Sequence, residues 1–187
     1  TGSGGRAVIL RADERADADD IIAHVAMWGF AQGRNEGFGQ GLVHTLTSLL
    51  LGTTLTWFGA EPATSTSKRA LPRSEGEWTT RLREEMRAGK DWPLAQVPRE
   101  RLDSFRESVR VKSWSFVTWL VARFPDRWTQ VFDAFPSDKL PELAAIEAII
   151  AKELGCSVEQ LDAEWRDWAG GDSPIAKATA TAPAGGK

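Results

Sequence analysis

The chain has 187 residues, with 23 Lys or Arg against 26 Asp or Glu and a formal charge of −3 at pH 7. This balance argues against a nucleic-acid-binding surface, and no segment approaches the roughly 18 uninterrupted apolar residues of a membrane-spanning helix. The single cysteine, Cys156, cannot form an internal disulfide, and no Cys/His spacing resembles a structural zinc site. We therefore expect a globular domain that packing stabilises, with neither nucleic acid nor a membrane span among its partners.

Small residues dominate both ends of the chain, and such segments bury too little apolar area to offset the entropy of ordering them. We predict tails at 1–16 and 171–187 around a single helical domain at 17–170, which contains a flexible Pro/Ser/Thr loop at 59–76. The chain begins with Thr and shows no signal-peptide pattern, which indicates a fragment or a processed product. Compartment and oligomeric state stay open, and export or a cell-envelope location would fit a signal in an upstream segment.

Two helices and one extended segment are expected in the first third of the chain. Residues 17–30 begin with acids and carry apolar residues at helical spacing. Residues 36–51 place Phe38 and Leu42 on one stripe, although they include three glycines that each cost about 1 kcal/mol in a helix interior. These glycines imply either a frayed start or the close approach of another segment. The alternating sequence at 53–58 predicts a short extended segment.

The remainder of the chain is helical by pattern. Apolar residues three or four positions apart predict helices at 77–88, 98–109, 113–124, 126–135 and 141–154. The segment at 113–124 is apolar almost all round, so we expect it to be the most buried helix. Gly155 suits a helix C-cap, and Ser157 with Gln160 forms a capping box for a last helix that runs through Trp168. With no alternation of strands and helices, the sequence predicts an all-α array of about seven packed helices.

Tryptophans and charges add two expectations about exposure. The five tryptophans at 114, 119, 128, 165 and 168 stand at helical spacing, which favours core packing. Trp57, Trp78 and Trp92 flank the predicted loop and are candidates for a partly open groove. The stretch at 99–112 mixes arginines with acids, which is typical of a solvated helix face.

Catalytic groups are scarce in this sequence. The chain has two histidines, His24 and His44, and no serine stands in a nucleophile-elbow context, which argues against a Ser-His-Asp triad. A metal site is the sharper hypothesis, because Asp20, His24 and Glu36 come from neighbouring expected helices and His44 follows Glu36 by two turns. The simpler interpretation has His24 bonded to Asp20 and makes His44 a partly exposed helix residue.

Zinc hydrolysis requires about three protein ligands and a carboxylate that activates the bound water. The HExxH motif supplies two histidines one helical turn apart with the base beside the first. At the window that begins with His24, Val25 stands in place of the base and Trp28 in place of the second histidine. The catalytic set is therefore missing from the chain as given.

Three segments nevertheless resemble peptidase MA-like (gluzincin) proteins. Residues 35–39 (NEGFG) look like the xEGxA/G segment of that family, in which the Glu is the third zinc ligand. Residues 112–125 are similar to the buried helix near the end of the family's domain, and residues 153–168 are similar to its final helix pair with the pattern LG-x-S-x-x-x-L-x-x-x-W. The resemblance spans roughly 21–169 and implies an ancestral zinc site to which Glu36 would have contributed.

The leading hypothesis is a catalytically degenerate peptidase MA-like domain, a pseudoenzyme that binds a protein or peptide or serves as a structural module and needs no cofactor. Its cleft candidates are Asp20, Trp28, Asn35, Gln40 and Trp57, beside Glu36 and His24. The alternative is an active zinc metallopeptidase, or a fragment of one, that hydrolyses peptide bonds with Glu36, His24 and His44 as ligands or with HExxH in an upstream segment. A third interpretation, a purely structural module, expects Glu36 to be exposed and far from both histidines.

Overall fold

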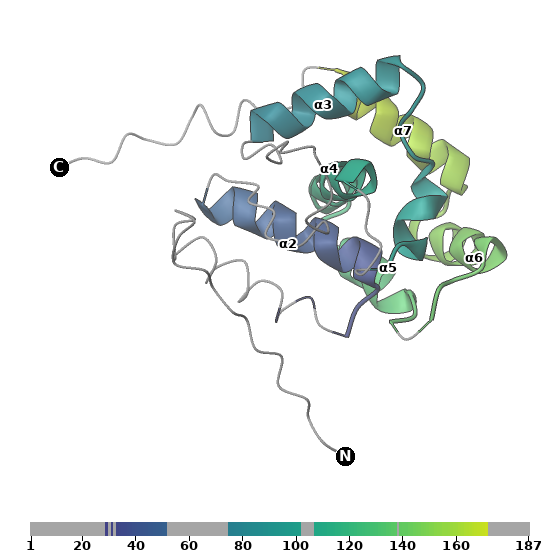
Figure 1. Cartoon of the computed structure of the whole chain (residues 1–187). Helices are drawn as coiled ribbons and strands as arrows, with labels where there is room; N and C mark the ends of the chain where they lie inside the picture. Colours follow the sequence, from purple (N-terminus) through teal and green to yellow (C-terminus); the bar gives the residue numbers. More distant parts are fainter. Residues whose placement is uncertain are drawn as a thin grey trace, which may run out of the picture.

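A computed structural model of the chain describes residues 29, 31, 33–51, 75–101, 107–137 and 139–171 (Figure 1). Every regular element within these ranges is helical. In chain order the elements are α2 (Glu36–Leu51), α3 (Glu75–Arg87), the 3₁₀-helix η1 (Leu94–Arg99), α4 (Glu107–Arg123), α5 (Trp128–Ala134), α6 (Leu143–Leu154) and α7 (Val158–Gly170). The predicted all-α fold class is confirmed.

Several predictions fall outside the described residues. The expected helix at 17–30, apart from Gly29, and the expected extended segment at 53–58 both lie outside them. Of the loop expected at 59–76, only the last two residues are described, and they begin α3.

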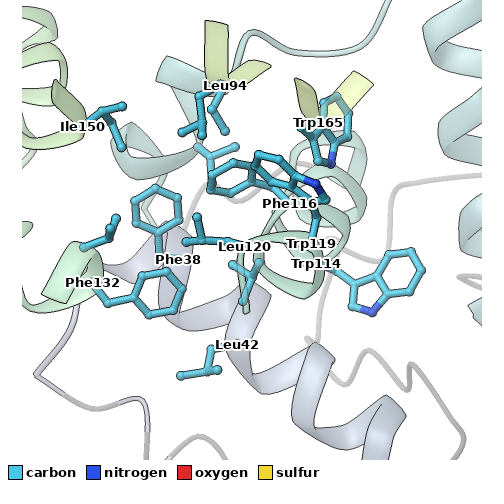
Figure 2. Packing of buried hydrophobic residues seen from close by; sticks show 14 of the residues in the cluster. Phe38, Leu42, Leu94, Trp114, Phe116, Trp119, Leu120, Phe132, Ile150 and Trp165 are labelled. Carbon is cyan, nitrogen blue, oxygen red and sulfur yellow. The ribbon is translucent and has the colours of Figure 1, made fainter. Parts of the chain in front are cut away.

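Helix α4 lies at the centre of the array, where it contacts α2, α3, α7 and η1 (Figure 1). Its apolar side chains are buried all round the helix, as expected of the segment at 113–124. Figure 2 shows how side chains from the surrounding elements converge on α4. The cluster joins Phe38 and Leu42 of α2, Leu94 of η1, Phe132 of α5, Ile150 of α6 and Trp165 of α7 to Trp114, Phe116, Trp119 and Leu120 of α4.

Close packing against neighbouring segments explains two of the three glycines of α2, Gly37 and Gly41. A Cβ built on Gly41 would lie 2.6 Å from the carbonyl oxygen of Ser113 and 2.7 Å from Cγ2 of Val117, both on α4. A Cβ on Gly37 would collide with the carbonyl group of Val97 in η1. The hydroxyl of Ser113 donates to the carbonyl oxygen of Gly37 at 2.6 Å. Of the two expectations for the glycines, the close approach of another segment is therefore the one observed at Gly37 and Gly41.

Gly41→Ala should lower the free energy of unfolding by about 1–3 kcal/mol, because the added methyl group has to displace α4 backbone. Gly39→Ala is the matched control on the same helix. Its Cβ would meet Ala31 at 3.7 Å, an ordinary contact, so the better helix propensity of alanine should leave the protein equally stable or stabilise it by up to about 1 kcal/mol. Urea denaturation of both variants checks the pair, and equal effects would contradict the close packing at Gly41.

The α-helix start expected at Pro98 is wrong. Pro98 lies near the end of η1, Glu100 is extended with φ −83° and ψ 141°, and α4 begins at Glu107. Proline at a helix start is favourable, but proline also disfavours the α conformation of the residue before it, and here it stands inside a short 3₁₀-helix. Residues 102–106 of the expected helix lie outside the described residues, and 107–109 belong to α4.

The junction between α6 and α7 follows local sequence signals. Gly155 ends α6 in the left-handed region with φ 76°, where glycine has no Cβ penalty. At the start of α7, Ser157 Oγ accepts from the Gln160 amide at 3.1 Å, and the Ser157 amide donates to Gln160 Oε1 at 2.9 Å. Both the C-cap and the capping box are confirmed.

Candidate functional site

Asn35, a predicted cleft residue, joins the start of α2 to η1. Its Oδ1 accepts from the Phe38 amide at 3.3 Å and so caps the helix, while its Nδ2 donates to the carbonyl oxygen of Pro98 at 2.8 Å. The side chain is buried. Both ends of the amide are thus used to hold the fold in place.

Glu36 is exposed in the first turn of α2, where a carboxylate interacts favourably with the helix dipole. It lines a small pocket of about 40 Å³ that also includes Asn35, Glu100, Arg101, Pro136, Ser137, Lys139 and Leu140. We call this the Glu36 pocket. The volume admits a small polar group or water but is far below the roughly 300 Å³ of a typical small-molecule site. Two cations, Arg101 and Lys139, and two carboxylates share its walls.

Gln40 and His44 follow Glu36 on α2, and both are buried. The ring of His44 lies 5.0 Å from that of Trp78, at an interplanar angle of 59°. The expectation that His44 is partly exposed is therefore wrong, as is the expectation that Trp78 lines an open groove, because Trp78 belongs to the core. Among the residues that the structure describes, Gln40 Oε1 is buried without a hydrogen-bond donor.

The described part of the chain does not by itself form the zinc site of the alternative hypothesis. Glu36 and His44 are eight residues apart on one helix, about 12 Å along its axis, whereas zinc–ligand bonds are about 2 Å long. Within the described ranges no three His, Cys, Asp or Glu side chains group closely enough to hold a metal ion. Asp20, His24, Trp28 and Trp57 lie outside those ranges. A zinc site that includes Glu36 would need further ligands from residues outside the described ranges, such as His24.

The structure also shows a buried group of charges that the sequence analysis missed. Lys112 of α4 has a side chain only 1% exposed, and its Nζ lies 2.8 Å from Asp162 Oδ1 and 3.3 Å from Asp91 Oδ2. The same ammonium group lies 4.2 Å from the ring centroid of Trp165. The expectation of a solvated helix face at 99–112 is therefore wrong for Lys112 and also for Glu100 and Arg110, which are buried as well, while residues 102–106 lie outside the described residues.

Arg166 completes this group, which we call the Lys112 network (Lys112, Asp91, Asp162 and Arg166). Its two terminal nitrogens lie 2.8 Å from the two carboxylate oxygens of Asp91, and its Nε lies 3.1 Å from Asp162 Oδ2. Two cations and two carboxylates thus balance each other, and the forked contact to Asp91 is a strong type of ion pair. The network connects α4, α7 and the segment between α3 and η1. A lysine at the edge of an apolar helix is the one sequence signal that could have indicated the Lys112 network.

Burial lowers the pKa of Lys112 below its ordinary 10.5, and the carboxylates of Asp162 and Asp91 oppose this only in part. The folded protein therefore releases this proton at lower pH than the unfolded chain does. Between the folded-state pKa and 10.5 the unfolded state binds more protons, so the contribution of Lys112 to the free energy of unfolding rises with pH.

We expect this rise in stability to be absent from Lys112→Met when urea denaturation is measured from neutral pH to about pH 10.5. Burial also raises the pKa of Cys156 above 9.0, which lowers stability as the pH rises, so the comparison is made in a Cys156→Ala background. Lys152→Met, at a side chain 79% exposed, is the control and should keep the slope of the parent protein. Identical slopes for all three proteins would contradict the assignment to Lys112.

Two further findings complete the description of the site. No helix within the described ranges is long and apolar enough to cross a membrane. Comparisons of the chain with protein-family models, with curated proteins and with solved structures find no match.

Proposed function

We propose that this chain is a catalytically degenerate helical domain, similar to the later part of peptidase MA-like proteins, that binds a peptide or protein segment and does not hydrolyse it. The proposal rests on the NEGFG segment and its surroundings. Gly37 of this segment packs against η1 and Asn35 caps α2, so the fold itself accounts for these residues. Glu36 is the residue of the segment whose side chain is exposed.

The observation that carries the proposal is the composition of the Glu36 pocket. In the resembled family this Glu is a zinc ligand, and a zinc ion is best placed among histidines and carboxylates. The Glu36 pocket instead contains Arg101 and Lys139, whose positive charges offset the negative charges of Glu36 and Glu100, so the pocket offers a divalent cation no net negative charge. A carboxylate flanked by cations suits the recognition of polar groups of a peptide better than the activation of water.

An exposed leucine in the pocket wall and a second one three residues further along the chain support peptide binding. Leu140 lines the Glu36 pocket and is 45% exposed, and Leu143, three residues further along the chain, is 53% exposed. Large apolar side chains at the rim of a polar pocket are typical of interaction sites, because their burial on binding is favourable. A bound peptide could place an apolar side chain on the two leucines and a neighbouring polar group in the Glu36 pocket.

The loss of catalysis is tested by loading the purified chain with Zn²⁺, dialysing it and measuring bound zinc and hydrolysis of fluorescent casein. We expect far less than one equivalent of zinc and no hydrolysis above the buffer rate. One equivalent of zinc that disappears in Glu36→Ala, together with casein cleavage, would establish the metallopeptidase instead.

Peptide binding is tested by selecting phage-displayed random peptides on the immobilised chain. Peptides that bind should lose about tenfold in affinity on Leu140→Ser or Leu143→Ser, the effect of removing an anchoring contact. Leu49→Ser is the matched control, because Leu49 is 67% exposed near the other end of α2. Recovery of no peptide, or an equal loss in the control, would favour the purely structural module, whose expectation of an exposed Glu36 also agrees with the structure.

A further inference from the structure

The segment at 91–101 runs from the Lys112 network to the Glu36 pocket. Asp91, at its start, pairs with Lys112 and Arg166. At its end, Glu100 and Arg101 line the Glu36 pocket. Between the two ends lies η1, so one short piece of chain physically connects α7 to the start of α2.

The 3₁₀-helix η1 has little stability of its own. It is six residues long and contains Pro98, and short helices of this type have poor hydrogen-bond geometry. Its position depends on contacts with α2, α4, α6 and α7. At the α2 side, Pro98 accepts the hydrogen bond from Asn35, and Val97 lies against Gly37.

We infer that the Lys112 network is a positioning device for residues 91–101: Arg166 and Lys112 hold Asp91 in place, and η1 transmits this position to Asn35 and to the walls of the Glu36 pocket. A change in the network on α7 will therefore alter the start of α2, although α7 itself does not line the Glu36 pocket. The inference concerns the chain alone and does not depend on the proposed peptide binding.

Helix α7 has enough other contacts to stay docked when Arg166 is replaced. Leu161 and Trp165 are fully buried in the core, and Arg83 of α3 donates to the carbonyl oxygens of Ala169 and Gly171 at the end of α7. The Arg166 side chain is 38% exposed, so its loss leaves no large cavity. Its replacement should therefore loosen Asp91 without unfolding the domain.

A second ion pair between the same two helices provides the matched control. Arg123 of α4 and Glu164 of α7 lie 3.9 Å apart, with side chains 59% and 51% exposed. This pair joins α4 to α7, as Lys112 and Asp162 do, but neither residue pairs with Asp91. Exposed pairs of this kind contribute little to stability.

The experiment is amide hydrogen exchange on the full chain, followed by NMR, for Arg166→Met, Arg166→Lys and Arg123→Met. In Arg166→Met we expect exchange at Gln96 and Glu100 of the 91–101 segment to accelerate about tenfold, the effect of losing a charged hydrogen bond, and the amide signals of residues 35–38 to shift. Arg166→Lys, which keeps the charge but loses the fork, should give a smaller acceleration. In Arg166→Met, the amides at 147–154 of α6 should exchange at the rate of the parent protein. In Arg123→Met, all amides should exchange at that rate.

Two results would overturn the inference. Unchanged exchange at residues 96 and 100 in Arg166→Met would mean that Asp91 does not position the segment. An equal acceleration in α6 would mean that the network stabilises the whole fold without a specific effect on η1. Because Arg166→Lys retains the positive charge, it supplies the same comparison if Arg166→Met does not fold.

Discussion

Lys112→Met should lower the free energy of unfolding by about 3–5 kcal/mol, because the carboxylates of Asp162 and Asp91 lose the hydrogen bonds from Lys112 Nζ, which a neutral lysine amine at high pH would keep. In the folded protein Nζ of Lys112 lies between Asp162 and Asp91, with a side chain only 1% exposed. Methionine fills the same space but donates no hydrogen bond. Urea denaturation at pH 7 measures the change, and Lys152→Met, whose parent side chain is 79% exposed, should change it by less than about 0.5 kcal/mol.

The double variant Lys112→Met/Asp162→Asn tests whether a carboxylate that has lost its hydrogen-bond donor is the cause. It removes one cation and one carboxylate, and Asp91 keeps its forked contact with Arg166 at 2.8 Å. We expect it to be more stable than Lys112→Met alone, since mutations within one charge network are not additive. A double variant less stable than the single variant would assign the loss to packing.

Trp114→Ala should also destabilise the protein by about 3–5 kcal/mol, the usual cost of removing a buried tryptophan. Trp114 is buried on central helix α4 and its ring lies 5.4 Å from that of Trp78 in an edge-to-face contact. Its loss leaves a cavity between α4 and α3 that the rigid backbones cannot close.

Trp168→Ala is the control for Trp114→Ala, because Trp168 is only partly buried against the core. Its replacement should cost clearly less, in proportion to the smaller apolar area that it removes from water. Urea denaturation of the two variants provides the comparison. Equal losses would mean that α4 is not the centre of the fold.

Local sequence signals predicted those elements whose structure depends on neighbouring residues. The capping box of Ser157 and Gln160 and the left-handed Gly155 each involve contacts within a few residues, so they could be read directly from the chain. The apolar run at 113–124 likewise identified the most buried helix, because a helix without a polar face can only be stable inside a core.

The surroundings of Glu36 could not be predicted from local sequence signals. The NEGFG segment predicted a helix start and a residue of interest, and Glu36 is indeed exposed at the start of α2. Its neighbours Arg101 and Lys139 come from 65 and 103 positions further along the chain. No periodicity or spacing near residue 36 contains information about them.

By itself, the sequence determined the helical class, most helix positions and the caps of α6 and α7, because backbone hydrogen bonds and apolar periodicity are properties of short segments. Only the tertiary structure decided that Lys112 is buried among Asp91, Asp162 and Arg166, and that Gly41 permits contact with α4. A charged residue in a mixed stretch is ordinarily solvated, and its burial becomes stable only when opposite charges from other elements surround it. That partnership is a property of the packed helices, not of the stretch that contains Lys112.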